Sequence, residues 1–416
     1  MRDGKRLIYE ARLGFLRDPS DGHPDDWWVV SLEDLSQTKT GFWPAAAAMG
    51  LREAQLGITP DSWLGSDDRI VFSARLGQSV DLWTVAISPD SGKALGDPKR
   101  LTAGGLDDTQ PASSVQGRIV FTSGETRERL WTVDLADRSG TDRPERVSSG
   151  VADEADPMLT RDSRNVLFVR NESAWLRELA TGNESIVAQE SIAGALISPD
   201  GSSVVYRGPD DATNLKADVR GGPAAVVCSG CGWPADWSRD GTSILITTGP
   251  PDSGRALLVD VASSESSLLV EHPEFTTWNH KFSPDGRWVA FHVTIAPDLR
   301  QVFVASIDGE RPVPVDSWIP VTDAETNCAK PVWSPEGDRI YYLSDLEGTY
   351  CLYSQPFDSN SKPVAGPPTA VHHFHDPRWS IPSITSLRYE VHEDRLIVPL
   401  TERTGNVWML EPNETE

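Results

Sequence analysis

The segment Phe282-Ser-Pro-Asp-Gly-Arg-Trp-Val-Ala-Phe291 decides the fold class of this chain. It joins the turn phrase Ser-Pro-Asp-Gly to a short run rich in aromatic and β-branched residues. Proline presets φ at the second turn position, aspartate caps the turn, and glycine takes the positive φ that closes it. The segment therefore predicts a hairpin corner followed by a β-strand.

The corner phrase recurs along the chain. It returns as Ile197-Ser-Pro-Asp-Gly201, Trp237-Ser-Arg-Asp-Gly241 and Trp333-Ser-Pro-Glu-Gly337, and the four copies are 40, 45 and 51 residues apart. A weaker copy, Leu159-Thr-Arg-Asp-Ser163, precedes them. A period of this length is typical of propeller blades, each built from four strands.

Further strands follow each corner at regular intervals. A third strand in each unit carries a bulky residue at its centre, as in Leu82-Trp-Thr-Val85, Leu130-Trp-Thr-Val133 and Val407-Trp-Met409. Large flat side chains of this kind fill the wedge between stacked blades. The blade-like units fall near 4–41, 60–103, 108–149, 153–188, 191–228, 233–271, 276–322, 328–372 and 376–411.

These units predict an all-β chain: a single closed β-propeller of four-stranded antiparallel blades over residues 1–416. Nine units exceed the common range for propellers, so we expect eight blades within a range of seven to nine. The first unit lacks an inner strand before its Arg2-Asp3-Gly4 corner, and the last lacks an outer strand after Trp408. We therefore expect the first and last units to meet and close the ring.

The corner phrase followed by a strand and Leu-Trp-Thr-Val resembles the WD-repeat-like propeller repeat of the TolB type. A narrower likeness lies in Val227–Gly241, Phe282–His292, Trp318–Thr322 and Gly405–Met409. These segments resemble the propeller at the C-terminal end of some bacterial serine/threonine kinases and winged-helix regulators. That resemblance implies a sensory or partner-binding role, although kinase signatures and a winged helix are missing here.

Charge narrows the choice of partner. The chain has a formal net charge of −24 at pH 7, which disfavours nucleic acids and anionic membranes. A neutral or cationic protein, peptide or small ligand is expected instead. The N-terminal residues carry no apolar run of signal-peptide length, so a cytoplasmic location is expected. A periplasmic location stays open if the chain is part of an exported or membrane-anchored protein.

Several residues could carry chemistry. Cys228 and Cys231 have redox or zinc spacing, but a structural pair is favoured. His373, His375 and Asp376 could bind a metal, and on a strand the two histidines share one face while His372 points away. A surface cluster is favoured there, so neither a metal nor another cofactor is expected.

The acidic corner residues call for a separate interpretation. Asp200, Asp240, Asp285 and Glu336 recur at the same position in each phrase and are expected to cap turns. Calcium would need about six to eight oxygens converging at one place.

Function is expected to be binding or sensing rather than catalysis. The sequence contains no Gly-x-Ser-x-Gly nucleophile elbow. Binding is expected on the loop face or at the channel mouth, where each inner strand begins. The candidate residues there are Trp233, Trp278, His280, Asn327 and Lys330. The alternative is a propeller-type hydrolase or lyase that acts on a carbohydrate or lactone through a carboxylate pair.

Overall fold

The computed structural model describes residues 5–11, 26–52, 58–64, 68–77, 79–136, 144–148, 150, 152–189, 193–210, 212–249, 254–358, 364, 366–376, 378–385, 387–392 and 394–411. The chain divides into two compact units, one of Met1–Thr126 with Arg403–Glu416 and the other of Arg127–Glu402. Each unit is considered by itself below.

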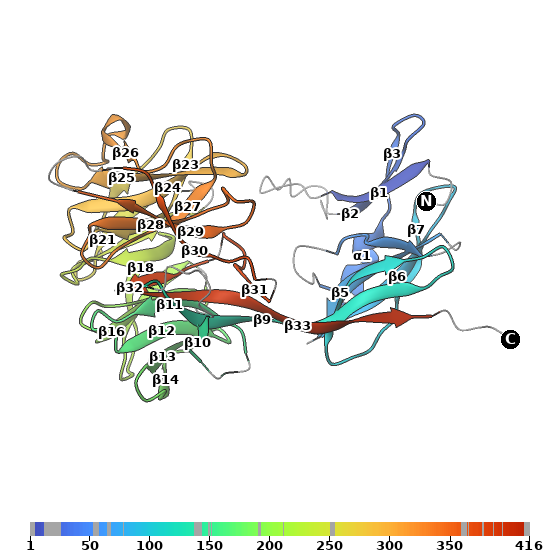
Figure 1. Ribbon diagram of the computed structural model, residues 1–416, viewed down its shortest axis with the longest axis horizontal. Coiled ribbons are helices and arrows are strands. Elements are labelled where there is room, and N and C mark those ends of the chain that lie inside the picture. The colour runs from blue at the N-terminus through green and yellow to red at the C-terminus, as the bar shows by residue number, and fades with distance from the viewer. Residues whose placement is uncertain are drawn as a thin grey trace. The chain divides into compact units, whose positions relative to one another are not determined.

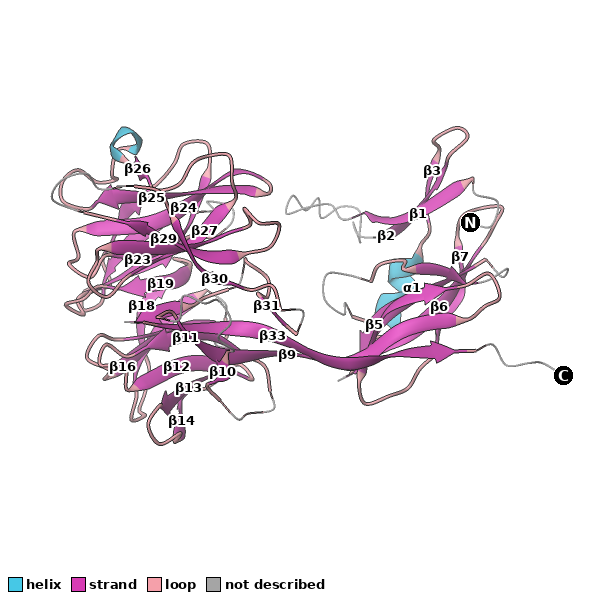
Figure 2. Ribbon diagram, in the orientation of Figure 1, coloured by secondary structure: helices cyan, strands magenta, loops and turns pink. Residues whose placement is uncertain are grey.

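The all-β prediction is confirmed (Figures 1 and 2). The described residues form eight sheets, six of them four-stranded, in which paired strands run antiparallel. Within the described residues, α1 (Phe42–Ala48) is the one α-helix, and the sequence did not predict it.

The second unit holds five of the four-stranded sheets in chain order. The first is β11 (Glu154–Leu159), β12 (Asn165–Arg170), β13 (Ser173–Glu178) and β14 (Glu184–Ala188). The second is β15 (Ala193–Ile197), β16 (Ser203–Arg207), β17 (Thr213–Asp218) and β18 (Ala225–Ser229). The third is β19 (Trp233–Trp237), β20 (Ser243–Thr247), β21 (Ala256–Asp260) and β22 (Ser266–Val270).

The fourth sheet is β23 (Thr276–Phe282), β24 (Trp288–Ala296), β25 (Leu299–Ser306) and β26 (Ile319–Pro320), with a 3₁₀ turn at Val315–Ser317 before its last strand. The fifth is β27 (Cys328–Trp333), β28 (Arg339–Ser344), β29 (Cys351–Pro356) and β30 (Thr369–His373).

A sixth sheet of this unit is assembled from two distant parts of the chain. Its strands are β32 (Glu390–His392), β33 (Arg395–Leu410), β9 (Ile119–Asp134) and β10 (Glu145–Arg146), paired in that order. The Leu135 N–H donates to the Asp394 carbonyl at 2.6 Å where β9 and β33 meet. The short strand β31 (Trp379–Ser380) also pairs with β33.

The innermost strands close into a ring. β11 contacts β15, and the contacts continue through β19, β23, β27 and β32 back to β11. Since β9 precedes the five sheets and β33 follows them, their pairing ties the two ends of this unit together. The second unit is thus a closed propeller in which six sheets surround one axis.

The prediction that the last unit, 376–411, meets the first unit, 4–41, was wrong. β33 pairs with β9 on one edge and with β31 and β32 on the other, so its partner comes from the unit predicted at 108–149 and not from 4–41. The Arg2-Asp3-Gly4 corner lies outside the described residues. Hairpin turns form each blade from neighbouring residues, whereas closure of the ring depends on which strands from distant parts of the chain pair.

The corner phrase forms the turn between the first and second strand of a sheet. At Phe282–Gly286, the Asp285 carboxylate accepts from the Ser283 hydroxyl at 2.5 Å and from the Arg287 N–H at 3.1 Å. The Gly286 N–H closes the turn onto the Ser283 carbonyl at 2.9 Å, with φ at 72°. Asp200 and Asp240 make the same contacts in their corners, so their predicted capping role is confirmed.

Glu336 departs from this pattern. The Ser334 hydroxyl donates to Asp338 at 2.8 Å instead. A glutamate side chain is one methylene longer, and the neighbouring aspartate replaces it as the cap. The predicted capping role of Glu336 is therefore wrong.

Bulky side chains fill the space between sheets as expected. Trp131 is 6% exposed, and Phe291 packs edge-on against Trp318 with ring centroids 4.8 Å apart. Trp408 is the exception at 56% exposed, so that tryptophan is not a wedge residue.

The first unit holds a three-stranded sheet and a four-stranded one. Their strands are β1 (Arg6–Ala11), β2 (Asp26–Ser31) and β3 (Gln37–Lys39), then β4 (Ser62–Leu64), β5 (Arg69–Leu76), β6 (Ser79–Ile87) and β7 (Ala94–Arg100). In addition, β8 (Asp107–Ser113) pairs with the start of β9.

Helix α1 is anchored in the core of the first unit. Asp26 accepts from the N–H groups of Gly41 at 2.9 Å and Phe42 at 3.0 Å, which satisfies donors at the helix start. Phe42 stacks on Trp27 with ring centroids 3.8 Å apart, and both side chains are fully buried.

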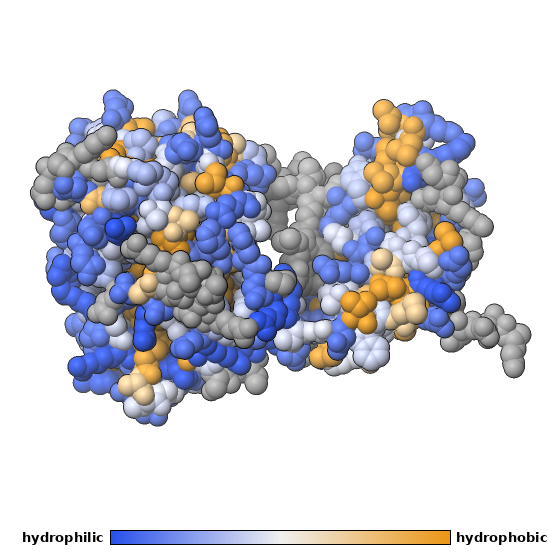
Figure 3. Space-filling view, in the orientation of Figure 1, coloured by the Kyte–Doolittle hydropathy of each residue, from blue (hydrophilic) through white to orange (hydrophobic). Residues whose placement is uncertain are grey.

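No helix among the described residues is long and apolar enough to cross a membrane. On the face drawn in Figure 3, hydrophilic residues predominate and hydrophobic ones occur in small groups.

Candidate functional site

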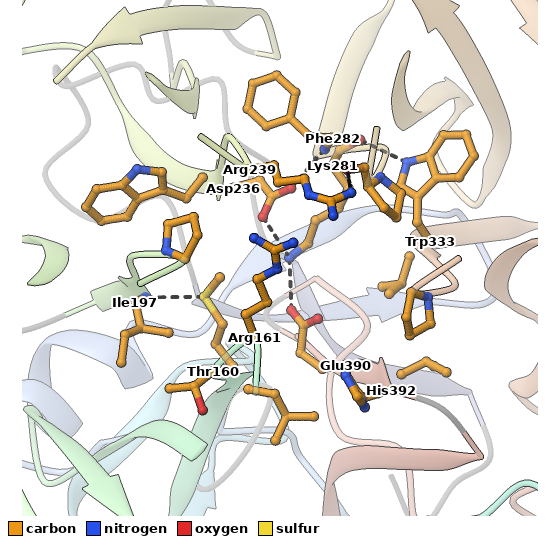
Figure 4. Close-up of a pocket in the computed structure, with 18 of the residues that line it drawn as sticks. Thr160, Arg161, Ile197, Asp236, Arg239, Lys281, Phe282, Trp333, Glu390 and His392 are labelled. Atoms are coloured by element: carbon orange, nitrogen blue, oxygen red, sulfur yellow. Dashed lines mark hydrogen bonds and ion pairs between the residues drawn. The ribbon is translucent and has the colours of Figure 1, made fainter. Parts of the chain in front are cut away.

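A cavity of about 400 Å³ opens where the innermost strands of the second unit end. All six sheets contribute to its lining, which includes Met158 and Thr160 from the first, Ile197 from the second, Asp236 from the third, Lys281 from the fourth, Trp333 from the fifth and Glu390 from β32. Figure 4 shows Thr160, Ile197, Asp236, Lys281, Trp333 and Glu390 around one space. The cavity is the mouth of the central channel, on the side of the corner turns.

A bulge in five of the six innermost strands, all but β32, helps to aim side chains at this mouth. In β23 the pairing register shifts between Trp278 and Lys281, and Asn279 takes a φ of 56°. In β19 a similar shift lies between Pro234 and Asp236. Bulges bend a strand and redirect its side chains.

An ion cluster occupies one side of the mouth. Lys281 Nζ lies 3.1 Å from Glu390 Oε1 and 3.7 Å from Asp236 Oδ1. The Phe282 N–H also donates to Asp236 Oδ2 at 2.8 Å. The three charged side chains are 13 to 20% exposed, so the cluster is mostly shielded from water.

Burial and charge oppose each other in this cluster. Burial raises the pKa of Asp236, although Lys281 acts in the opposite direction. Burial alone would lower the pKa of Lys281, but the carboxylates of Glu390 and Asp236 hold it above its usual value. Lys281 therefore stays charged at neutral pH and binds both carboxylates.

Two further cationic side chains line the mouth near this cluster. Arg161 and Arg239 project from the corners of the first and third sheets, and both are exposed. The Arg239 Nη1 group donates to the Pro284 carbonyl at 2.8 Å, which holds this side chain across the next corner. Figure 4 shows both guanidinium groups beside the Lys281 cluster.

A second cavity of about 260 Å³ shares part of this wall. Arg161, Ser198, Pro199, Trp237 and Arg239 line both cavities, and Lys216 is added in the second. The two cavities are therefore neighbours that share a wall at the corner of the second sheet.

The carboxylates of Asp200 and Asp240 in the second cavity accept hydrogen bonds from residues of their own corner turns. Hydrogen bonds from Ser198 and Ser202 lower the pKa of Asp200 to about 2, and those from Thr242 and Ser238 lower the pKa of Asp240. Both carboxylates therefore stay ionised at neutral pH, and the three cations Arg161, Arg239 and Lys216 outnumber them in the lining of this cavity.

The five predicted binding residues lie elsewhere in the second unit, and none of them lines either cavity. His280 is fully buried between the hydroxyl groups of Thr247 and Thr277, each 2.9 Å from a ring nitrogen. Burial lowers its pKa to about 3, so it is neutral.

Asn327 and Lys330 are also buried, at 7% and 6% exposed. The Asn327 amide donates to Tyr350 at 2.8 Å and to Asp345 at 3.2 Å. Lys330 Nζ donates to the Thr385 carbonyl at 2.9 Å. Their contacts in the structure are thus with the protein itself.

Trp233 and Trp278 are half-buried, with ring centroids 6.2 Å apart. The guanidinium of Arg207 lies 4.3 Å from the centre of the Trp233 ring. A binding role for these two tryptophans stays a prediction.

The remaining candidates are placed as follows. Cys228 and Cys231 form a disulfide. His373 and His375 lie together, with ring centroids 5.3 Å apart, whereas His372 packs against Phe374. Asp376 contacts Arg378 and is not part of the histidine group.

The sequence reasoning missed the residues of the mouth. Asp236 and Lys281 each stand immediately before a corner phrase. Because the corners end the innermost strands, this position in the sequence could have identified both residues as part of the mouth. Glu390 lies outside any corner phrase and had no such signal.

The sequence matches no family model and no curated protein. Among solved structures, TolB from Agrobacterium tumefaciens is 18% identical over 67% of this chain and 99% of that chain, with a TM-score of 0.48. Oligogalacturonate lyase from Vibrio parahaemolyticus is 12% identical over 84% of this chain and 96% of that chain, with a TM-score of 0.40.

The β-propeller domain of the Trilobed protease from Pyrococcus furiosus is 13% identical over 76% of this chain and 97% of that chain, with a TM-score of 0.40. A shared fold does not determine function. The solved structures that this chain is similar to are TolB and other β-propeller proteins.

Proposed function

We propose that this chain is a binding protein whose channel mouth takes a peptide segment of a partner protein, with a carboxylate of that segment held by Arg161 and Arg239. The observation that carries the proposal is the shared wall, in which these two arginines line both the mouth and the adjoining cavity. Arginine pairs with carboxylates through two parallel hydrogen bonds, which gives orientation as well as attraction.

The net charge of the chain and the charges at the mouth favour ligands of different charge. The net charge of −24 favours neutral or cationic partners at long range. Within the mouth, Lys281 already binds Asp236 and Glu390, while the two arginines extend over the opening. A short anionic group on an otherwise neutral peptide satisfies both conditions.

The mouth also offers apolar contacts. Phe282, Trp237 and Trp333 line it, and Pro199 and Pro284 form part of its rim. Peptide and ligand sites commonly combine such apolar walls with a few polar groups that set orientation. A segment with an apolar side chain next to an acidic residue or a C-terminal carboxylate is the best match.

Enzymatic function is the weaker candidate. Asp236 and Glu390 are the carboxylate pair that a propeller-type hydrolase or lyase would need at the mouth. Both contact the same lysine, and Asp236 also accepts a backbone N–H. A pair bound in this way suits structural support better than acid and base catalysis.

The resemblance to the propellers of bacterial kinases and winged-helix regulators fits the same proposal. That resemblance implies a sensory or partner-binding role for the propeller. We therefore propose that the chain senses or recruits a partner through its mouth.

The proposal can be tested with a library of random peptides displayed on phage and selected on the full chain. Enriched peptides are then synthesised, and their dissociation constants are measured by fluorescence anisotropy. We expect the peptides to contain Asp, Glu or a free C-terminal carboxylate, and Arg161→Glu with Arg239→Glu to weaken binding at least about tenfold.

Arg164→Glu is the matched control, because Arg164 lies in the same corner as Arg161 but outside both cavities. It should retain the affinity of the unchanged protein. Equal weakening by Arg164→Glu, or none by the Arg161 and Arg239 variants, would reject the mouth as the binding site.

A further inference from the structure

Four metal-type donor groups gather at one end of the fifth sheet of the second unit. They belong to Glu347, Cys351, His373 and His375, and one potential ligand atom from each lies within 4.8 Å of the others. Cys351 begins β29, His373 ends β30, and Glu347 lies in the turn that precedes β29.

The sheet register explains why these residues meet. Cys351 is directly opposite His373 in the pairing of β29 with β30. His375 follows two residues after His373, and successive residues on an extended chain point to opposite sides, so the two histidines share one side. The donors thus come from three short segments that hydrogen bonding already holds side by side.

Three of the separations between donor atoms are close to those of a compact coordination shell, and all four atoms lie within 4.8 Å of one another. Glu347 Oε2 lies 3.1 Å from His373 Nδ1 and 3.7 Å from His375 Nε2, which in turn lies 3.2 Å from Cys351 Sγ. Tetrahedral zinc with bonds of about 2.0 to 2.3 Å places its ligand atoms about 3.3 to 3.7 Å apart.

Two further observations point to a ligand at this place. His373 Nδ1 is buried and makes no hydrogen bond within the described part of the chain, although the Glu347 carboxylate is near. The other carboxylate oxygen, Glu347 Oε1, accepts from the Tyr353 hydroxyl at 3.0 Å. Partners of this outer kind orient the ligands of protein metal sites.

We propose that Glu347, Cys351, His373 and His375 form a four-coordinate zinc site. A thiolate and two imidazoles are donors that zinc prefers, whereas calcium and magnesium require shells of oxygen ligands. On binding, the Cys351 thiol releases its proton to solvent and its sulfur bonds to the metal. The bound ion joins the turn before β29 to the outer strand β30.

The site is separate from the channel mouth. Trp333, at the end of β27, lines the mouth and pairs with Ile340, whereas Cys328, at the start of β27, pairs with Ser344 near the zinc cluster. The mouth and the cluster therefore lie at opposite ends of the same sheet. Zinc binding is thus independent of the peptide site proposed above.

The test uses the full chain, stripped of metal with a chelator and kept reduced. Zinc stoichiometry and affinity are measured by competition with a chromophoric chelator, and Co²⁺ serves as the spectroscopic probe. We expect one ion per chain and, with Co²⁺, the thiolate charge-transfer band and strong visible bands of a tetrahedral site. Cys351→Ser should remove the charge-transfer band, and His375→Gln should weaken binding more than about tenfold.

Two controls identify the thiol. Cys328→Ser changes the other buried free cysteine, and the double change Cys228→Ser with Cys231→Ser removes the disulfide pair. Both should keep the cobalt spectrum. His375 is 48% exposed, so His375→Gln tests the site even if Cys351→Ser does not fold. A missing thiolate band in the unchanged protein, or a band that survives Cys351→Ser, would overturn the proposal.

Discussion

Lys281 Nζ lies 3.1 Å from Glu390 Oε1, which joins β23 to β32 across 109 positions of sequence. Asp236 on β19 contacts the same ammonium group at 3.7 Å. One lysine therefore links the innermost strands of three sheets at the channel mouth. Its removal leaves two mostly buried carboxylates close together without their ion-pair partner.

We expect Lys281→Met to lower the free energy of unfolding by roughly 3–5 kcal/mol, since breaking a buried ion pair from one side leaves an uncompensated charge. The triple variant Asp236→Asn, Lys281→Met, Glu390→Gln should recover most of this loss. Urea unfolding followed by tryptophan fluorescence measures both. A single variant as stable as the unchanged protein would contradict a role of the cluster in joining the sheets.

Two residues of β33, the strand that pairs with β9, are expected to differ in their contribution to stability. Leu400 is fully buried in the core of the second unit, whereas Trp408 in the same strand is 56% exposed. Leu400→Ala should cost about 2–5 kcal/mol, because it removes buried methyl groups and leaves a cavity. Trp408→Ala is the matched control and should change stability much less. Calorimetry of the two variants gives the comparison.

The pH dependence of stability should report on Lys330. Burial, followed by the charge of Arg388, lowers the pKa of Lys330 to about 7. Between about pH 7 and pH 10 the unfolded chain keeps this proton while the folded chain loses it. Stability should therefore rise with pH in this window, by at most about 1.4 kcal/mol per pH unit from this group.

Lys330→Met should remove that rise, since methionine carries no proton. The exposed Lys93 offers a control, and Lys93→Met should leave the slope unchanged. The measurement is the free energy of unfolding by urea at several pH values, taken as the difference between each variant and the unchanged protein. A difference for Lys330→Met that stays flat across the window would show that Lys330 is charged there in the folded chain.

In the corner of the fifth sheet, the acidic residues Glu336 and Asp338 are expected to differ in their effect on stability. Asp338→Ala removes the acceptor of the Ser334 hydroxyl and should destabilise the chain by about 1 kcal/mol. Glu336→Ala changes an exposed side chain in the same turn and should stay within about 0.5 kcal/mol. Thermal unfolding of the pair tests this, and a larger loss for Glu336→Ala would restore the role predicted for it.

The sequence was informative wherever a structural signal is local. Ser283, Asp285 and Gly286 form their turn with partners at most five residues away, so the phrase alone predicted the corner. His373 and His375 were placed on one face by simple alternation, and the structure brings them together. Asp338 was overlooked because the capping role was assigned to the fourth residue of the phrase, Glu336, without considering which side chain can reach Ser334.

The sequence alone thus determined the all-β class, the period of the blades and the position of the corner turns, because these depend on backbone preferences of adjacent residues. Only the tertiary structure decided that β9 pairs with β33, that Lys281 lies between Asp236 and Glu390, and that Cys351 and Glu347 join the histidines. Each of these depends on contacts between distant segments, whose pairing and burial no short stretch of sequence encodes.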